Sequence, residues 1–232
     1  MAFVLDFDGT LSPVDVGETL LVRYGGVNQA RAQRLWREGR LGSKAMHLRQ
    51  YPLLSGRRAA VDAFVDGVAL DEGLSEFQEV CRRLGARILV VSDGMDYYIR
   101  RILDRHGLAD AQVYANHLEF VDGRVALAFP HENPWCDRCA NCKGALVRDL
   151  RREGWRVAYV GNGLSDRFAA PLADRIFAKD ELAAELDRDR ISYTPFATFR
   201  DVAAAIEREG VFPPRACSDR GDPPVCRFGP GY

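Results

Sequence analysis

The stretch Ala2-Phe3-Val4-Leu5-Asp6-Phe7-Asp8-Gly9-Thr10-Leu11 decides the fold of this 232-residue chain. A short apolar run that ends in acidic residues and a glycine is typical of a buried parallel strand whose carboxyl end opens into a loop. Asp6 and Asp8 lie two residues apart, so both carboxylates reach one cavity if the chain turns at Gly9. Close carboxylates repel each other unless a cation neutralises them, which predicts a bound divalent ion. The alternative is a strand end at which the two aspartates only cap a turn.

Two further apolar runs end in the same way. Residues 86–91 lead into Ser92-Asp93-Gly94, and residues 157–160 lead into Gly161-Asn162-Gly163. Helical patterns follow each run, and strands that alternate with helices predict an α/β fold with a doubly wound, mainly parallel, Rossmann-like sheet. In such sheets ligands bind beyond the carboxyl ends of the strands, where these three polar loops fall.

The segment between the first two strands is too long for a single crossover helix. Residues 13–70 carry helical patterns that are broken by Gly25-Gly26, Gly39 and Pro52, which predicts a small helical-bundle cap inserted after the first strand. Residues 1–12 and 71–210 then form the α/β core. Within that core, residues 113–129 alternate around Val121-Asp122-Gly123 and predict a β-hairpin. Residues 211–232 are rich in Pro, Gly and Arg, and we expect a flexible tail there.

The composition excludes several classes of protein. Hydrophobic residues make up 47% of the chain and charged residues 28%, and the formal net charge is −1. A disordered chain would have fewer apolar residues, and a nucleic-acid binder would carry a basic surplus. The apolar runs are far shorter than the roughly 20 residues that a membrane-spanning helix needs, and no signal peptide is legible. We therefore expect a cytoplasmic protein that binds neither nucleic acid nor membrane, and the sequence does not indicate its oligomeric state.

Four motifs follow one another in an order that resembles the haloacid dehalogenase superfamily of phosphatases. Asp6-Phe7-Asp8-Gly9-Thr10 looks like the first motif, Ser92 like the second and Lys143 like the third. Gly161-Asn162-Gly163-Leu164-Ser165-Asp166 looks like the acidic fourth motif. The helical insertion stands where the superfamily has its first-type cap, a placement shared with phosphoserine phosphatases. The resemblance covers about residues 1–209.

Other segments look closer to one branch of this superfamily. Ser92-Asp93-Gly94-Met95-Asp96-Tyr97-Tyr98, Ala115-Asn116-His117, Pro130-His131 and the cysteines before Lys143 resemble the phosphatases of methionine salvage, which act on a phosphorylated keto-enol intermediate. Vertebrate phosphocholine and phosphoethanolamine phosphatases share the same general layout. The resemblance implies a phosphatase of a small phosphorylated metabolite, either a methionine-salvage intermediate or a phosphoserine- or phosphocholine-type substrate.

The resemblance also implies roles for the site residues. Asp6 attacks phosphorus and forms an aspartyl-phosphate intermediate, while Asp8 protonates the leaving alcohol and then takes a proton from water. Lys143 supplies a compact positive charge beside the transferring group. Phosphate is bound by Thr10, Ser92, Asp93 and Gly94, and Mg²⁺ is held by Asp6, Asp8, Asn162 and Asp166.

Lysine is rare in this chain. Lys and Arg together number 32, yet only Lys44, Lys143 and Lys179 are lysines, so the ordinary surface cation here is arginine. A lysine is normally a solvated surface residue. Lys143, however, stands between a cysteine cluster and the start of a helical pattern, in the order expected of the motifs, which favours a catalytic role.

Asn162 departs from the superfamily pattern. The fourth motif usually begins with an aspartate that ligates the metal, and an asparagine keeps an oxygen ligand but loses one negative charge. Two expectations stay open. Either magnesium binds more weakly and the enzyme remains active, or the chain is a degenerate phosphatase that binds phosphorylated ligands without turning them over.

Asp15 and Glu18, at the start of the insertion, are candidates for substrate recognition. Asp15 stands where related phosphoserine phosphatases carry an acidic residue that faces the substrate amine. The alternative is that both are acidic residues favoured in the first turn of a helix that starts near Val14.

A cluster of cysteines precedes Lys143. His131, Cys136, Cys139 and Cys142 supply an imidazole and three thiols, which would fill a structural, tetrahedral zinc site. The alternatives are a local disulfide with one free thiol, or three reduced cysteines that pack a loop. Cys81 falls in a helical pattern and is expected in the core, while Cys217 and Cys226 fall in the tail.

Overall fold

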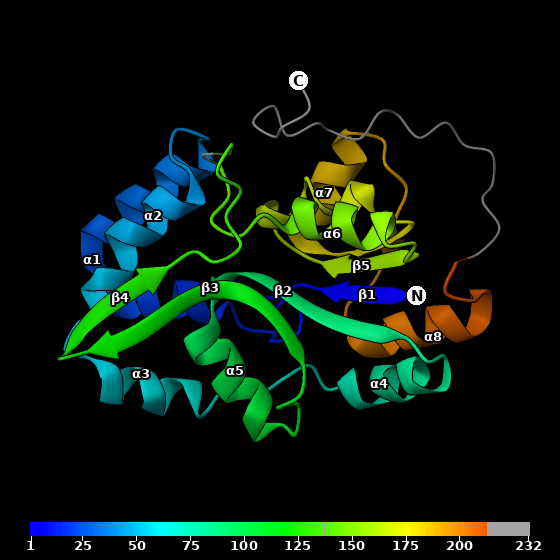
Figure 1. Cartoon of the computed structure of the whole chain (residues 1–232), viewed down its shortest axis with the longest axis horizontal. Coiled ribbons are helices and arrows are strands. Elements are labelled where there is room, and N and C mark those ends of the chain that lie inside the picture. The colour runs from blue at the N-terminus through cyan, green and yellow to red at the C-terminus, as the bar shows by residue number, and fades with distance from the viewer. Residues whose placement is uncertain (137, 213–232) are drawn as a thin grey trace. The chain divides into compact units, whose positions relative to one another are not determined.

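The computed structural model describes residues 1–136 and 138–212. A seven-stranded, mainly parallel sheet has the hydrogen-bonded order β4-β3-β2-β1-β5-β6-β7 (Figure 1). This confirms the predicted α/β class, and the predicted tail, apart from residues 211 and 212, lies outside the described residues. The strands are β1 (Ala2–Leu5), β2 (Arg87–Met95), β3 (Gln112–Val121), β4 (Arg124–Ala128), β5 (Val157–Gly161), β6 (Arg175–Ala178) and β7 (Thr194–Pro195).

Helices connect these strands. No helix of the described residues is long and apolar enough to cross a membrane. The α-helices are α1 (Val16–Arg37), α2 (Ser43–Gln50), α3 (Arg58–Val65), α4 (Leu74–Arg83), α5 (Asp96–Arg105), α6 (Lys143–Arg152), α7 (Asp180–Arg188) and α8 (Phe199–Glu209), and the 3-10 helices are η1 (Tyr51–Leu54), η2 (Leu164–Asp166) and η3 (Ala170–Leu172).

The described chain divides into two compact units. The first contains residues 1–13, 70–91 and 143–212, and the second contains residues 14–69 and 92–142. Strand β2 is continuous across the division, which falls after Val91. The predicted division into a core of residues 1–12 and 71–210 and a cap of residues 13–70 uses different boundaries and stays a prediction.

Strand β1 is the centre of the first unit. All four of its residues are buried, and it pairs in parallel with β2 on one side and β5 on the other, so that Ala2 lies opposite both Arg87 and Val157. Its apolar run therefore contacts protein on both faces, as expected of a central parallel strand. Phe77 of α4 packs between Phe3 and Phe199 of α8, with ring centroids 5.1 and 5.0 Å apart.

The second unit combines helices with a hairpin. Helix α1 kinks at Gly26, whose φ of 56° and ψ of −149° are open to glycine but strained for other residues. The predicted β-hairpin is present as β3 and β4, and its turn at Asp122 and Gly123 has φ values of 48° and 75°. Two positive φ values match the twist of an antiparallel pair. Arg101 of α5 forms two hydrogen bonds, of 2.7 and 2.9 Å, with Asp66, which follows α3.

Candidate active site

The loop after β1 positions the two predicted carboxylates. The backbone N–H of Asp6 donates to the Val160 carbonyl at 2.9 Å, so the parallel pairing with β5 continues one residue beyond the strand. The chain then turns through Gly9, whose φ is +76°, and the N–H groups of Thr10 and Ser12 donate to the Phe7 carbonyl. The predicted turn at Gly9 is therefore present. Asp6 is only 4% exposed.

Lys143 joins two carboxylates from distant parts of the sequence. It is the first residue of α6, its side chain is 2% exposed, and its Nζ lies 2.6 Å from Asp6 Oδ1 and 2.7 Å from Asp166 Oδ1. The same ammonium group donates to Ser165 Oγ at 3.1 Å. All three donors of this amine therefore have acceptors, which is what allows a buried lysine to remain charged.

Asp166 accepts hydrogen bonds from several other groups of this network. Its Oδ1 also accepts the hydroxyl of Tyr159 at 2.7 Å, and its Oδ2 accepts the backbone N–H groups of Asn162 and Gly163 at 3.1 Å each. A fully buried carboxylate that accepts from four donors keeps one orientation. Tyr159 was not predicted as a site residue, because it lies within an apolar strand and its sequence context indicates only core packing.

Burial and neighbouring charges shift the acidities of these groups. Burial, and then Asp166, raise the pKa of Asp6 from 3.8 to about 7, against the opposing effect of Lys143. Burial alone would lower the pKa of Lys143, but Asp166 and Asp6 outweigh it, and the net shift is upward. Burial and then Asp166 raise the pKa of Tyr159, so this hydroxyl stays protonated. An added positive charge beside Asp6 would favour its ionised form.

Asn162 lies directly against the Asp6 loop. Thr10 Oγ1 donates to Asn162 Oδ1 at 3.0 Å, and a Cβ on Gly9 would stand only 2.2 Å from Asn162 Nδ2. The absence of a side chain at Gly9 thus makes room for the amide. Carboxylate and amide oxygens are the ligands that Mg²⁺ prefers, so Asp6, Asp8 and Asn162 fit a hard divalent cation by their chemistry.

The predicted phosphate-binding segment Ser92-Asp93-Gly94 belongs to the second unit. The Gly94 N–H donates to Ser92 Oγ at 2.9 Å, which orients the hydroxyl. Asn141 donates its side-chain amide to the Ser92 carbonyl at 2.8 Å and its backbone N–H to Asp93 Oδ1 at 3.0 Å. Asn116 donates to the Asp93 carbonyl at 2.6 Å. Asn141 was not predicted, because the cysteines that flank it dominate its sequence context.

Asp15 and Glu18 stand at the start of α1. Asp15 is its N-cap, and its carboxylate accepts the backbone N–H of Glu18 at 2.7 Å. Burial raises the pKa of Asp15. The capping role of Asp15 is therefore present, and substrate recognition by either residue stays a prediction.

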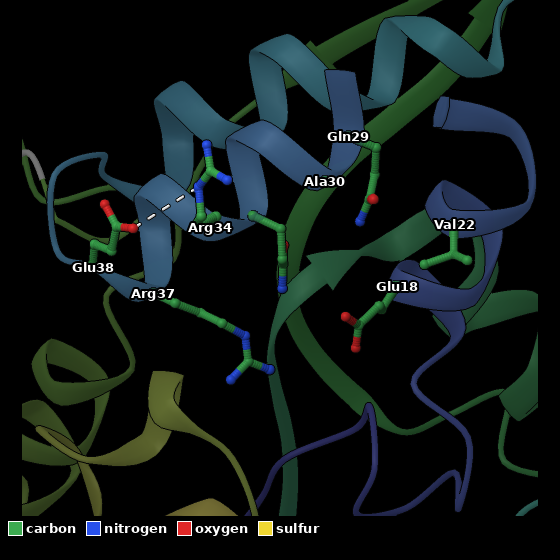
Figure 2. Close-up of a pocket in the computed structure, with 8 residues that line it drawn as sticks. Glu18, Val22, Gln29, Ala30, Arg34, Arg37 and Glu38 are labelled. Carbon is green, nitrogen blue, oxygen red and sulfur yellow. Dashed lines mark ion pairs between the residues drawn. The ribbon is translucent and has the colours of Figure 1, made fainter. Parts of the chain in front are cut away.

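A hollow of about 460 Å³ lies along α1. Figure 2 shows the side chains of Glu18, Gln29 and Arg37 extending from α1 toward the same opening. Two acidic, two basic and two amide side chains line the hollow. Its lining residues are Glu18, Val22, Gln29, Ala30, Gln33, Arg34, Arg37 and Glu38.

The predicted zinc site of His131, Cys136, Cys139 and Cys142 finds no support. Among residues 1–136 and 138–212, no group of three or more His, Cys, Asp or Glu side chains is placed to hold a metal ion. The Cys139 thiol instead shares hydrogen bonds with Cys136 and Cys142, and these bonds, with burial, raise its pKa.

The other predictions for the cysteines have mixed outcomes. Cys136, Cys139 and Cys142 form no disulfide among the described residues, so the predicted local disulfide is absent there. Cys81 is buried in α4, as expected. Cys217 and Cys226 lie outside the described residues.

Comparison with known proteins gives relatives in sequence and in structure. A 2-hydroxy-3-keto-5-methylthiopentenyl-1-phosphate phosphatase of Bacillus thuringiensis (strain Al Hakam) is 27% identical over 210 residues, which cover 87% of this chain and 94% of that protein. The same fold occurs in a hydrolase of Salmonella enterica serovar Typhi, with a TM-score of 0.70, 20% identity and coverage of 88% of this chain and 69% of that one. A phosphoserine phosphatase in a phospho-aspartyl analogue form has a TM-score of 0.66, 21% identity and coverage of 89% and 97%.

The family itself is established by a match over most of the chain. Residues 3–171 match the haloacid dehalogenase-like hydrolases. That range includes β1 with Asp6, β2 with Ser92, the start of α6 with Lys143 and the loop with Asp166, so it spans all four motifs. The resemblance predicted from these motifs is confirmed, and the chain belongs to the haloacid dehalogenase-like hydrolase family.

Proposed function

We propose that this hydrolase cleaves phosphomonoesters of small metabolites, with Asp6 as the nucleophile. The observation that carries the proposal is Lys143, whose buried ammonium group lies 2.6 Å from Asp6 and 2.7 Å from Asp166. A fixed cation beside a buried carboxylate is suited to hold a phosphate against it, because the positive charge offsets the repulsion between two anions. The Bacillus relatives are named as phosphatases, which supports the same activity.

The reaction then proceeds in two steps. In the first, a carboxylate oxygen of Asp6 bonds to phosphorus while the bond from phosphorus to the ester oxygen breaks, and Asp8 gives its proton to that oxygen. In the second, Asp8 takes a proton from water, the water oxygen bonds to phosphorus, and the bond to Asp6 breaks. Inorganic phosphate leaves, and both aspartates return to their starting states.

Asp6, Asp8 and Asn162 are the residues that would hold Mg²⁺. When bound, the ion supplies positive charge that favours the ionised form of Asp6 and neutralises phosphate oxygens. Asp166 already accepts donors from Lys143, Tyr159 and two backbone N–H groups. We therefore assign it to orienting Lys143 rather than to direct contact with the ion. The neutral amide of Asn162 implies weaker magnesium binding than an aspartate would give.

The first candidate substrate is 2-hydroxy-3-keto-5-methylthiopentenyl-1-phosphate, which the names of the sequence relatives specify. The alternative is a zwitterionic ester of the phosphoserine type, favoured by Glu18 and Arg37, which offer opposite charges to one hollow. A panel of small phosphate esters compared by kcat/KM separates the two. The keto-enol ester is expected to lead, and a higher value for phosphoserine would reverse the order.

The activity itself is tested with p-nitrophenyl phosphate, with and without Mg²⁺. We expect the native chain to release phosphate in the presence of the ion and Asp6→Asn to release none. Asp66→Asn, at a surface position, serves as the matched control and keeps the native rate. Phosphate release by Asp6→Asn at the native rate contradicts the proposed nucleophile.

Asn162 favours a second candidate, a phosphate-binding protein without turnover. This candidate predicts no phosphate release by the native chain at any magnesium concentration. It also predicts that Asn162→Asp gains activity, because the added carboxylate restores the charge that the metal site lacks. Release by the native chain at millimolar Mg²⁺ eliminates it.

A further inference from the structure

Asp93 is a largely buried carboxylate, 14% exposed, whose partners come from several segments of the second unit. Asn141 and Asn116 hold it from one side, as described above, and helix α2 contacts it through two side chains. The Ser43 hydroxyl favours the ionised form of the Asp93 carboxylate, and His47 Nε2 lies 3.6 Å from Asp93 Oδ2. Burial by itself would raise the pKa of Asp93, but His47, Ser43 and Asn141 hold it below its usual value.

The two contacts from α2 act as a pair. Ser43 and His47 are separated by four residues of one helix, so their side chains lie on the same face. The Ser43 hydroxyl is fixed by the indole N–H of Trp36 at 2.9 Å, and its backbone N–H donates to the Arg138 carbonyl at 2.8 Å. This anchoring fixes α2 where its polar face meets Asp93.

His47 has little other reason to be buried. It is 6% exposed, and its ring lies edge-on to Tyr51 with centroids 5.4 Å apart. Neither ring nitrogen has a hydrogen-bond partner within the described residues, and the nearest acidic group in an ion pair with it is Asp93. Burying an imidazole without hydrogen bonds costs free energy, which the nearby charge of Asp93 helps to offset.

Asp93 in turn is continuous with the predicted phosphate-binding hydroxyl. Asn141 contacts both the Asp93 carboxylate and the Ser92 carbonyl. Gly94, which follows Asp93 in the chain, donates its backbone N–H to Ser92 Oγ and so orients this hydroxyl. A displaced Asp93 therefore displaces Ser92 and Gly94 with it. Misplacing a phosphate-binding donor by a fraction of an ångström is enough to weaken charge-assisted hydrogen bonds.

We propose that His47 and Ser43 are positioning residues that act through Asp93 to hold the segment Ser92–Gly94 in its phosphate-binding conformation. This inference rests on the proposed function, because it takes Ser92 as a phosphate ligand. It makes α2, a helix of the inserted segment, part of the support of the phosphate site.

The test measures the binding of inorganic phosphate by isothermal titration calorimetry in buffer with Mg²⁺. We expect His47→Leu to bind phosphate about tenfold more weakly, and His47→Gln to recover most of the loss, because its amide N–H again faces Asp93. In an Asp93→Asn background, His47→Leu should change the affinity less than twofold, since the charge that His47 serves is gone. A purely structural histidine would give neither the rescue nor this dependence on Asp93.

Gln50→Leu is the matched control. Gln50 is fully buried on the same helix, but its amide donates to the Gln29 carbonyl and not to Asp93. We expect this variant to lose stability and keep its phosphate affinity. If His47→Leu does not fold, Ser43→Ala replaces it, with an expected loss of about threefold.

The outcomes separate this inference from the proposed function. Native phosphate affinity in His47→Leu, or an equal loss in Gln50→Leu, overturns the role of His47. A native chain that binds phosphate but releases none from p-nitrophenyl phosphate overturns only the proposed hydrolysis. A native chain that does not bind phosphate overturns the inference as well.

Discussion

At the scale of the residue, the Lys143 side chain determines how two buried carboxylates are neutralised. It forms ion pairs with Asp6 and Asp166 at 2.6 and 2.7 Å, all three groups being nearly inaccessible to solvent. Removing one partner of a buried ionic group leaves uncompensated charge, which typically costs about 3–5 kcal/mol. The sequence could indicate this lysine because lysine is so rare in the chain.

We predict that Lys143→Met abolishes phosphate release and lowers the free energy of unfolding by about 3 kcal/mol or more, because two carboxylates lose their shared cation. Urea denaturation and a phosphate-release assay measure the two effects. Lys44→Met is the control, since the Lys44 side chain is 42% exposed and forms its ion pair with Glu132 near the surface. A stable and active Lys143→Met would remove the basis of the proposed site.

The raised pKa of Asp6 leads to a dependence of stability on pH. Between pH 4 and 7 the folded chain holds a proton on Asp6 that the unfolded chain has lost, so the free energy of unfolding falls as the pH rises through this window. We predict that Asp6→Asn, without magnesium, gains stability relative to the native chain from pH 4.5 to 7.5. Urea denaturation at both pH values measures the change.

Asp66→Asn controls for the loss of a carboxylate in that experiment. The pKa of Asp66 is lowered to about 2 by Arg101 and then Arg105, so its charge is constant over the same window. The difference between Asp66→Asn and the native chain should therefore be equal at pH 4.5 and 7.5. A flat difference for Asp6→Asn as well would show that Asp6 is ionised throughout.

The sequence indicated the candidate site residues, but not the residues that hold them in place through hydrogen bonds. Asp6 and Lys143 have the spacing and scarcity that distinguish them from background. Asn141 acts through contacts with a segment far away in the chain, such as its 2.8 Å bond to the Ser92 carbonyl, and Tyr159 acts through a bond to Asp166 beyond the end of its strand. No local pattern encodes such contacts, because they depend on which strands become neighbours.

At the scale of elements, the site depends on the close approach of the loops after β1 and β5. Gly9 allows this close approach for two reasons. Its backbone adopts a φ of +76°, and the absence of a Cβ leaves the space that the Asn162 side chain fills. Gly107 shares the first property only, with a φ of +74° and no atom within 4 Å of its missing Cβ. The two glycines therefore separate backbone strain from steric exclusion.

We predict that Gly107→Ala lowers the free energy of unfolding by about 1–2 kcal/mol through backbone strain alone. Gly9→Ala should cost more, and should also abolish phosphate release, because its Cβ displaces Asn162. Thermal unfolding and the p-nitrophenyl phosphate assay compare the two variants. Equal costs and retained activity in Gly9→Ala would mean that Asn162 moves aside freely.

The strands that contain a clear apolar run could be predicted from the sequence, whereas β6 and β7 could not. β1, β2 and β5 follow clear apolar runs, whereas β6 begins with Arg175, and β7 has only two residues. The buried Arg175 is tolerated because it bonds to Glu209 and to the Val211 carbonyl. A charged residue whose partners lie 34 and 36 residues further along the chain cannot be recognised from local periodicity.

At the scale of the whole molecule, the three lysines occupy distinct environments. Lys44 and Lys179 form surface contacts, while the side chain of Lys143 is 2% exposed. We predict that reductive methylation of the folded protein modifies Lys44, Lys179 and the amino terminus but leaves Lys143 untouched, with activity retained. Peptide mass spectrometry checks this. Methylation of Lys143 before unfolding would show that its burial is transient.

The position of β1 at the centre of its unit has a consequence for synthesis. Ala2 leaves the ribosome well before one of its partners, Val157, which follows only after roughly 8–30 s at ordinary rates of translation. Throughout that interval an apolar segment has no strand to pair with on that side. The nascent chain is thus exposed to aggregation, and a chaperone that binds the emerging β1 segment would raise the yield of folded protein more than one acting after release.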